Sequence, residues 1–364
     1  MAQTGIPFLF MRGGTSRGPY FKRSDLPKDL DRLSKVLVAL VGSGHPFNID
    51  GIGGGTTVTT KVAMLSQSED DWADIDYFFA QVSVEDRLVD YKPTCGNILS
   101  GVAPAALEMG LIAAGDDETT VKIRAVNTEA RIIASVHTPN KQVEYEGKVA
   151  IDGVPGTAAP IELQFMDVVG GVTGAFLPTG SLIDEIDGIP VTCMDVAMPM
   201  VIARAEDFGL TGYESCDELD AHRYFYDRME PIRIEAGRRM GMGDVTNSVT
   251  PKFGLLAPPK AGGTISARYF MPWKCHPTMA VTGAQCLAAC LLTRNTVADG
   301  MARLPNEVPA CITLEHASGQ IDVIVDYDYE PDGFKLKSAG LIRTARKLAE
   351  GRVFVPALIW DGHG

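Results

Sequence analysis

A thiol stands where the sequence predicts the start of an apolar helix. Cys95 is followed by Gly96 and Asn97, and then by small and apolar residues through Leu107. Backbone N–H groups at a helix start attract anions, and the same local field favours the thiolate form of a cysteine. The pattern therefore predicts an anion-binding turn with a thiol that is able to move a proton. The alternative is a small cysteine buried in an ordinary helix cap.

Two loops rich in glycine and hydroxyl side chains come before this helix. The first, residues 12–18, has two adjacent glycines, a threonine and a serine between Arg12 and Arg17. The second, residues 50–60, leads into Lys61 at the edge of an apolar strand and lacks the spacing of a phosphate-binding P-loop. An arginine grips a carboxylate through paired hydrogen bonds, and a lysine that loses solvent becomes available as a base. The alternatives are a solvated hairpin turn for the first loop and a lysine ammonium that reaches water for the second.

Hydrophobic periodicity predicts the elements that position these residues. We expect helices over 24–41, 96–107, 218–240 and 285–292. We expect strands or extended apolar stretches over 6–12, 19–22, 76–84, 120–126, 130–137, 142–151, 189–200, 252–256 and 264–270.

The two halves of the chain follow the same order of elements. Each has strands, then a turn led by a cysteine, then a helix of small apolar residues; in the second half the turn is 274–284. This order predicts two related domains, 1–180 and 181–339, with the segment of about 340–364 returning to the first. We expect each domain to aim a helix start at one shared cleft.

Composition limits the class of protein. The chain has 364 residues, 45% of them hydrophobic and 22% charged, which is typical of a globular protein with two domains. A formal net charge of -13 argues against nucleic-acid binding. The 7 cysteines include no Cys-x-x-Cys and the 6 histidines form no zinc pattern, so we expect free thiols, a cytoplasmic location and no metal. No apolar segment reaches the length of a membrane span, so we expect no membrane partner.

Several motifs, taken together, resemble one family. They occur in order along the whole chain, at 11–16, 50–54, 60–63, 95–98, 151–156, 177–180 and 340–346. By these motifs the chain is similar to the PrpF-like isomerases, and within them to the members that act on 4-oxalomesaconate. Two positions differ from the family pattern. Arg17 stands where lysine is common, and Gly54-Gly55-Thr56 stands where the oxalomesaconate members carry Gly-Gly-Ala-Asp.

The resemblance implies a fold and a reaction. The fold is the α+β, diaminopimelate-epimerase-like fold, in which two pseudo-symmetric domains each wrap a curved β-sheet or barrel around a central helix. The family uses no cofactor and shifts a proton in an unsaturated di- or tricarboxylic acid. For this chain the implied reaction is keto–enol tautomerisation or allylic isomerisation of 4-oxalomesaconate in the breakdown of aromatic acids. The alternatives are a 2-methylaconitate or methylitaconate isomerase, and a carboxylate-binding protein without activity; a homodimer is left open.

The resemblance also assigns roles to single residues. Lys61 matches the family's catalytic lysine, and Cys95 matches the thiol of the first helix start. Both are candidates for the base; we expect Lys61 to be indispensable and Cys95 to assist. The second helix start has Met279 or Ala280 where a racemase carries its second thiol, so a mechanism with two thiols is disfavoured. The substrate-binding candidates are those matched to the carboxylate-binding loops, with further candidates added from the second loop and the second half: Arg12, Gly13, Gly14, Thr15, Ser16, Gly54, Gly55, Gly96 and Asn97, then Thr56, Arg268, His276, Thr278 and Met279.

Overall fold

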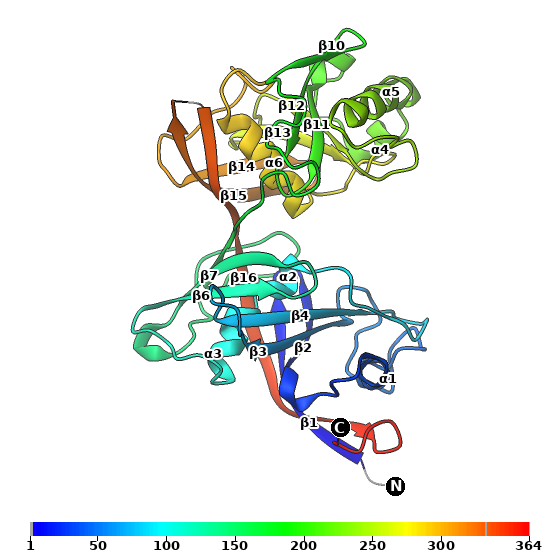
Figure 1. Ribbon diagram of the computed structural model, residues 1–364, viewed down its shortest axis with the longest axis vertical. Helices are drawn as coiled ribbons and strands as arrows, with labels where there is room; N and C mark the ends of the chain where they lie inside the picture. The colour runs from blue at the N-terminus through cyan, green and yellow to red at the C-terminus, as the bar shows by residue number, and fades with distance from the viewer. Residues whose placement is uncertain (1–2, 332, 364) are drawn as a thin grey trace. The chain divides into compact units, whose positions relative to one another are not determined.

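The computed structural model describes residues 3–331 and 333–363 and divides into two compact units (Figure 1). The first unit holds the residues up to Gln164 together with those from Ile342 onward, and the second runs from Phe165 to Leu341. The first boundary between the units falls at the end of strand β8 (Pro160–Phe165), the last strand of the first unit's sheet before the chain enters the second unit. It therefore lies before residue 180.

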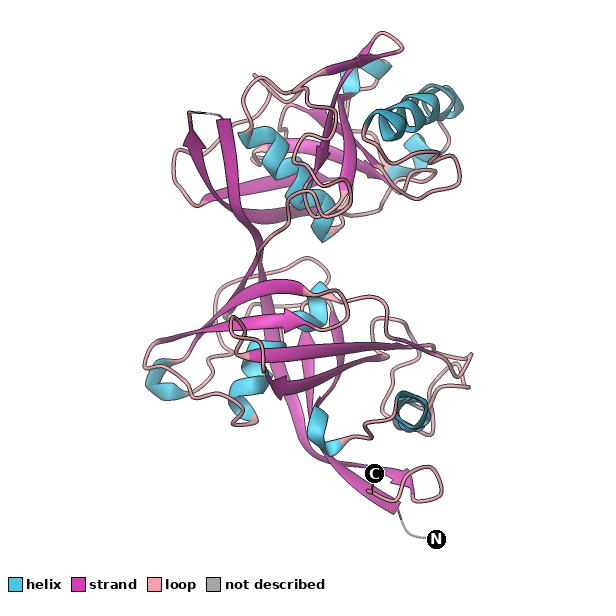
Figure 2. Cartoon of the chain, viewed as in Figure 1, coloured by secondary structure: helices cyan, strands magenta, loops and turns pink. Residues whose placement is uncertain are grey.

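Eight strands of the first unit close into a ring. Neighbours follow the order β1-β2-β3-β4-β6-β7-β8-β16, and β16 pairs back with β1. Figure 2 shows these strands in magenta around short cyan helices. Side chains alternate across each strand, so every second residue faces the interior of the ring. The strands are β1 (Gln3–Gly13), β2 (Ser16–Lys22), β3 (Lys61–Gln67), β4 (Ile75–Val82), β5 (Val89–Asp90, paired with β4), β6 (Glu118–Ala125), β7 (Ala130–His137) and β16 (Gly333–Pro356).

Two short helices pack inside this ring where one longer helix is predicted. They are α2 (Gly96–Leu99) and α3 (Val102–Glu108), and the chain between them is Ser100 and Gly101. Pro104 explains the break, because its ring would collide with the Ser100 carbonyl in a continuous helix and it has no N–H to donate. Helix α2 contacts β1, β2 and β3, and α3 contacts β3 and β7.

The second unit repeats this order of strands. From β10 to β15 the pairs alternate antiparallel, parallel, antiparallel, parallel and antiparallel. The same alternation runs from β1 to β7 in the first unit, with β5 left out. The strands are β9 (Asp184–Ile186), β10 (Ile189–Asp195), β11 (Pro199–Arg204), β12 (Lys252–Ala257), β13 (Ile265–Phe270), β14 (Ala310–His316) and β15 (Gly319–Glu330).

Helices occupy matching places in the two repeats. Helix α1 (Leu30–Val41) precedes β3, as α4 (Cys216–Asp220) and α5 (Arg223–Arg239) precede β12. Helices α2 and α3 precede β6, as α6 (Val281–Leu292) precedes β14. Helix α6 is buried at every residue from Gly283 onward, so it is the central helix of its unit. The predicted α+β fold, with a sheet around a central helix in each half, is confirmed.

Some predicted element boundaries are wrong. Residues 23–25 form a 3-10 turn, and α1 begins only at Leu30, after Asp29 accepts a hydrogen bond from the Arg32 N–H at 2.8 Å. Residues 142–151 form no strand and make only an isolated bridge between Val149 and Ala158. The alternating apolar side chains of that segment instead line a cavity on the outer face of the ring.

Gly18 sets how closely β2 approaches β3. A Cβ atom at Gly18 would collide with the Lys61 carbonyl oxygen. We expect Gly18→Ala to lower the free energy of unfolding by about 1–3 kcal/mol, because the strands must separate to make room. Thermal unfolding measures this, with Gly96→Ala as the control, since a Cβ there meets nothing within 4 Å. Equal Tm values for the two variants would contradict the packing argument.

Candidate active site

At one end of the ring, the β1–β2 turn lies against the start of α2. A Cβ atom at Gly13 would lie 2.5 Å from the Asn97 carbonyl oxygen, and one at Gly14 would collide with the Asn97 amide oxygen. The same amide oxygen accepts a hydrogen bond from the Thr15 N–H at 3.3 Å. Gly14 has a φ of 52°, which favours glycine. The structure therefore brings four of the predicted binding residues together. Their positions in the sequence alone do not show that they are neighbours.

Lys61 begins β3 and lies beside Gln81 of β4. Its Nζ donates to Gln81 Oε1 at 2.6 Å and lies 5.4 Å from the centroid of the Phe79 ring. Gln81 Nε2 in turn donates to the Thr57 carbonyl at 3.2 Å and to the Thr60 hydroxyl at 3.2 Å. These bonds fix which end of the amide meets the lysine. Because Gln81 is neutral, it orients the amine without placing a second charge beside it.

Cys95 is the N-cap residue of α2 and has a free, half-buried side chain. Its carbonyl oxygen accepts a hydrogen bond from the Tyr77 hydroxyl at 3.4 Å, and the Tyr77 ring lies 6.2 Å from the Phe79 ring. Cys95 and Lys61 therefore lie against neighbouring aromatic side chains of β4. Helix α2 has only 4 residues, so the field at its start comes from its first-turn N–H groups rather than from a long helix dipole.

Ser16 places a hydroxyl without a partner at the same end of the ring. The residue is 3% exposed, and its Oγ has no hydrogen-bond partner among the described residues. It stands opposite Gly13 in the pairing of β1 with β2. Leaving a buried polar group unpaired costs about 1–3 kcal/mol. The Ser16 hydroxyl is therefore ready to bond a ligand oxygen.

The loop that leads to β3 contains three more predicted binding residues: Gly54, Gly55 and Thr56. The Gly55 N–H donates to the Asn48 amide oxygen at 2.8 Å, and the hydroxyls of Thr56 and Thr59 lie 3.0 Å apart. These donors hold the shape of the loop. The structure places the loop directly before Lys61, and substrate contact by its three residues stays a prediction.

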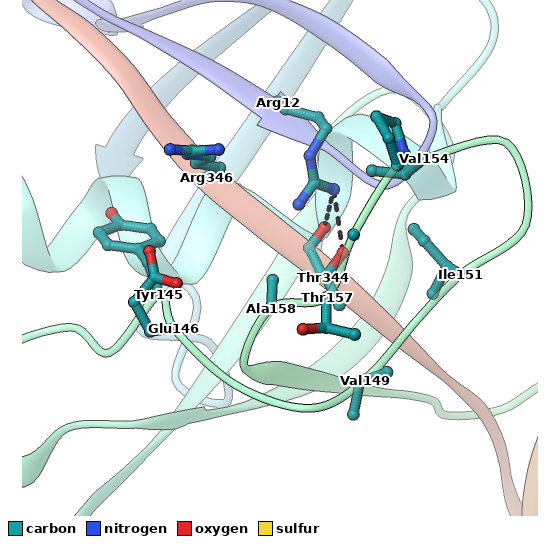
Figure 3. Close-up of a pocket in the computed structure, with 12 residues that line it drawn as sticks. Arg12, Tyr145, Glu146, Val149, Ile151, Val154, Thr157, Ala158, Thr344 and Arg346 are labelled. Atoms are coloured by element: carbon teal, nitrogen blue, oxygen red, sulfur yellow. Dashed lines mark hydrogen bonds between the residues drawn. The ribbon is translucent and has the colours of Figure 1, made fainter.

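Arg12 lies on the opposite face of β1 from Gly13, because consecutive strand residues point to opposite faces. Figure 3 shows its guanidinium directed at Thr344. Its Nη1 donates to the Gly14 carbonyl at 2.9 Å, and to the carbonyl and hydroxyl of Thr344 at 2.9 and 3.0 Å. Burial, and then the charge of Arg346, lower the pKa of Arg12. The structure does not gather this guanidinium with the interior residues, and its contact with substrate stays a prediction.

Three predicted residues of the second unit, His276, Thr278 and Met279, come directly before α6, and Arg268 lies on β13. Arg268 is 6% exposed, and its Nε donates to the Glu214 carbonyl at 2.8 Å. His276 Nδ1 accepts a hydrogen bond from the Thr278 N–H at 3.1 Å. Burial lowers the pKa of His276, so its ring is neutral near pH 7. The Met279 side chain lies in the apolar core, so only its backbone is left to meet a ligand.

The N-cap residue of α6 is Ala280, in the place that Cys95 has in the first repeat. Cys275 is 1% exposed and lies away from that position, with its Sγ 3.2 Å from the Cys216 Sγ. Burial raises the pKa of Cys275. The second helix start therefore carries no thiol, as the sequence predicts.

Sequence reasoning missed Gln81. The available signal is the alternation of the predicted strand 76–84, which puts Tyr77, Phe79 and Gln81 on one face and so places an amide beside two aromatic rings. Its partner Lys61 is found only from the pairing of β3 with β4.

Two kinds of site are absent from the described part of the chain. Within residues 3–331 and 333–363, no three His, Cys, Asp or Glu side chains group in a way that could hold a metal ion. No helix in these ranges is both long enough and apolar enough to span a membrane.

A family model described as "PrpF protein" matches residues 3–356. The chain belongs to the PrpF family. It is 45% identical over 362 residues to the 4-oxalomesaconate tautomerase of Pseudomonas putida, across 100% of this chain and 99% of that protein. It is 44% identical over 349 residues to the (4E)-oxalomesaconate Delta-isomerase of a Novosphingobium species, across 96% and 97%.

A solved structure has the same fold. The crystal structure of methylitaconate-delta-isomerase matches with a TM-score of 0.91 at 31% identity, covering 99% of this chain and 97% of that one. The family resemblance of the PrpF chain and its diaminopimelate-epimerase-like fold are thereby confirmed.

Proposed function

We propose that this PrpF protein is an isomerase that moves a proton within 4-oxalomesaconate. Two relatives at 45% and 44% identity are named for that compound. The observation that carries the proposal is the 2.6 Å hydrogen bond from Lys61 to the neutral Gln81. It holds an amine in place at the end of the ring where a thiol and an unpartnered hydroxyl also lie.

Lys61 is the proposed base. A proton on carbon beside a keto or carboxylate group is far less acidic than any side chain, so removal requires donors that stabilise the enolate as it forms. The Ser16 hydroxyl and the first-turn N–H groups of α2 are the proposed donors to the enolate or carboxylate oxygens. Cys95 assists, by hydrogen bonding or by handling the proton at one end of the shift. The proposed reaction uses no cofactor and no metal.

The same groups serve two reactions. In a keto–enol shift the proton passes between carbon and oxygen, whereas in an allylic shift it passes between two carbons and the double bond moves. One relative is named a tautomerase and the other a Delta-isomerase, and their identities to this chain are nearly equal. Their names therefore do not distinguish the two reactions. A role in aromatic-acid breakdown and a cytoplasmic location are further proposals, made from the family resemblance and from the free cysteines.

A second candidate is an isomerase of methylitaconate or 2-methylaconitate. It is supported by the TM-score of 0.91 with methylitaconate-delta-isomerase, although the identity is lower at 31%. A carboxylate-binding protein without activity is the candidate from another class. The presence of both an amine and a thiol at one end of the ring favours an enzyme.

An assay in D₂O separates these candidates. The purified protein is incubated with 4-oxalomesaconate, 2-methylaconitate and methylitaconate and followed by ultraviolet absorbance and proton NMR. We expect turnover of 4-oxalomesaconate with deuterium at one defined carbon, and kcat/KM at least about tenfold above the other acids, as for one well-placed polar contact. Deuterium at the far allylic carbon identifies the allylic reaction. Preferred turnover of methylitaconate or 2-methylaconitate would contradict the proposed substrate, and no exchange into any acid would contradict the enzyme.

Gln81 provides a test of the state in which Lys61 acts. Gln81→Glu places a carboxylate beside Lys61 Nζ and favours the ammonium form of Lys61. The proposed base is then lost near neutral pH. We expect kcat/KM at pH 7 to fall at least about tenfold and the rising limb of its pH profile to move to higher pH.

Gln81→Met is the matched control, because it removes the hydrogen bond without adding charge. It should lower kcat because Lys61 is no longer held in position, and it should leave the rising limb of the pH profile at the same pH. A rising limb that stays in place in the Gln81→Glu variant, with the falling limb moved to higher pH, would show that Lys61 acts as an ammonium donor rather than as a base.

A further inference from the structure

A cavity on the outer face of the first unit's ring holds two arginines. It has a volume of about 100 Å³ and lies between β1, β16 and the irregular segment 145–158 (Figure 3). Arg12 of β1 and Arg346 of β16 both line it, and so does Thr157. Within the described residues neither guanidinium forms an ion pair with a carboxylate.

The two arginines are held beside each other by the fold. Arg12 stands opposite Arg346 in the pairing of β1 with β16, and opposite Arg17 in the pairing of β1 with β2. Side chains directly opposite in an antiparallel pair share one face, with Cβ atoms about 4.5–5.5 Å apart, and like charges there repel. The facing pair of Arg12 and Arg346 therefore costs free energy unless an anion lies between them.

Donors on both guanidiniums are free to bind such an anion. Arg12 uses Nη1 for the Gly14 and Thr344 oxygens, and its Nε and Nη2 make no hydrogen bond within the described residues. Arg346 makes none there, and it is exposed at the mouth of the cavity. A guanidinium offers a planar fork that matches two oxygens of one anion.

Two acidic side chains near the cavity, Glu108 and Glu146, do not neutralise this pair. Glu108 accepts hydrogen bonds from the Tyr145 hydroxyl at 3.2 Å and from Lys347 Nζ at 2.8 Å, so its charge is already matched. Glu146 lines the cavity with an exposed side chain but forms no ion pair with either arginine. The charged residues that line the cavity are Arg12, Arg346 and Glu146, so its lining is positive in a chain with a net charge of -13.

We propose that this cavity is a binding site for a small oxyanion, either inorganic phosphate or the carboxylate of a small organic acid. Its volume of about 100 Å³ accommodates a few water molecules or one such group. That is well below the roughly 300–1,000 Å³ of pockets for larger ligands. The site lies on the opposite face of β1 from Gly13 and does not depend on the proposed isomerase reaction.

The anion holds the 151–156 loop in place. This segment is one of the motifs shared with the family, and Val154, Pro155 and Gly156 line the cavity. A Cβ atom at Gly153 would lie 3.4 Å from the Thr15 methyl group, so the loop also borders the β1–β2 turn. An occupied cavity therefore supports the outer side of the turn that packs on α2.

Calorimetric titration of the full chain tests the proposal. Sodium phosphate and sodium malonate are the two probes, and sodium chloride at matched ionic strength is the blank. Arg346→Gln should weaken binding about tenfold or more, as for one lost charge-assisted contact. Glu146→Gln should strengthen it by removing a repelling carboxylate. Arg352→Gln, an exposed arginine further along β16 that does not line the cavity, should bind as the parent chain does.

Hydrogen exchange of backbone amides locates the bound ion. Amides of 145–158 should exchange more slowly with phosphate or malonate in the parent chain and should not respond in Arg346→Gln, whose folding is checked by its Tm. Protection by phosphate alone or by malonate alone identifies the source of the oxyanion. Equal binding by Arg346→Gln and Arg352→Gln, protection only at the start of α2, or no binding of either probe would overturn the proposal.

Discussion

The first unit depends on the close contact between the β1–β2 turn and the helix inside the ring. The Tyr20 hydroxyl, from a fully buried side chain, donates to the Ile98 carbonyl at 2.5 Å. A Cβ atom at Gly101 would collide with that hydroxyl, and one at Gly13 would press on the Asn97 carbonyl. Glycine at these positions lets two backbones approach where side chains would keep them apart. The start of α2, with its N–H groups and its thiol, is positioned by this contact.

Closure of the ring determines which motif residues face the same surface. Arg12 and Gly13 are neighbours in the sequence, yet one faces outward to β16 and the other inward to α2. Consecutive residues of a strand therefore serve different surfaces. The inward set holds the groups proposed to act on the substrate, and the outward set forms the arginine pair beside the 145–158 segment.

Much of the fold could be predicted from the sequence because local patterns are strong. Alternation marks β4, β6 and β7, and the run of small apolar residues marks α6, although its start lies earlier than predicted. The break before Pro104 was missed because apolar composition conceals the backbone conflict that a proline creates. The segment 142–151 alternates like a strand, but the alternation covers a cavity instead of a sheet face.

The candidate site could be predicted only in part. Lys61 and Cys95 stand out because each has a reactive group at the end of an apolar segment. Gln81 could not be paired with Lys61, because the contact depends on the register of β3 against β4. Register is set by the closed ring as a whole, which no single segment of the sequence specifies.

In the proposed reaction Lys61 moves the proton and Cys95 assists. The most direct measurement is the rate of solvent deuterium incorporation into 4-oxalomesaconate by Lys61→Met and Cys95→Ser, each shown by circular dichroism to be folded. We expect Lys61→Met to lose at least about 10²-fold of the exchange rate, as for a lost general base, and Cys95→Ser to lose less. Exchange at the parental rate by Lys61→Met, with none by Cys95→Ser, would contradict it.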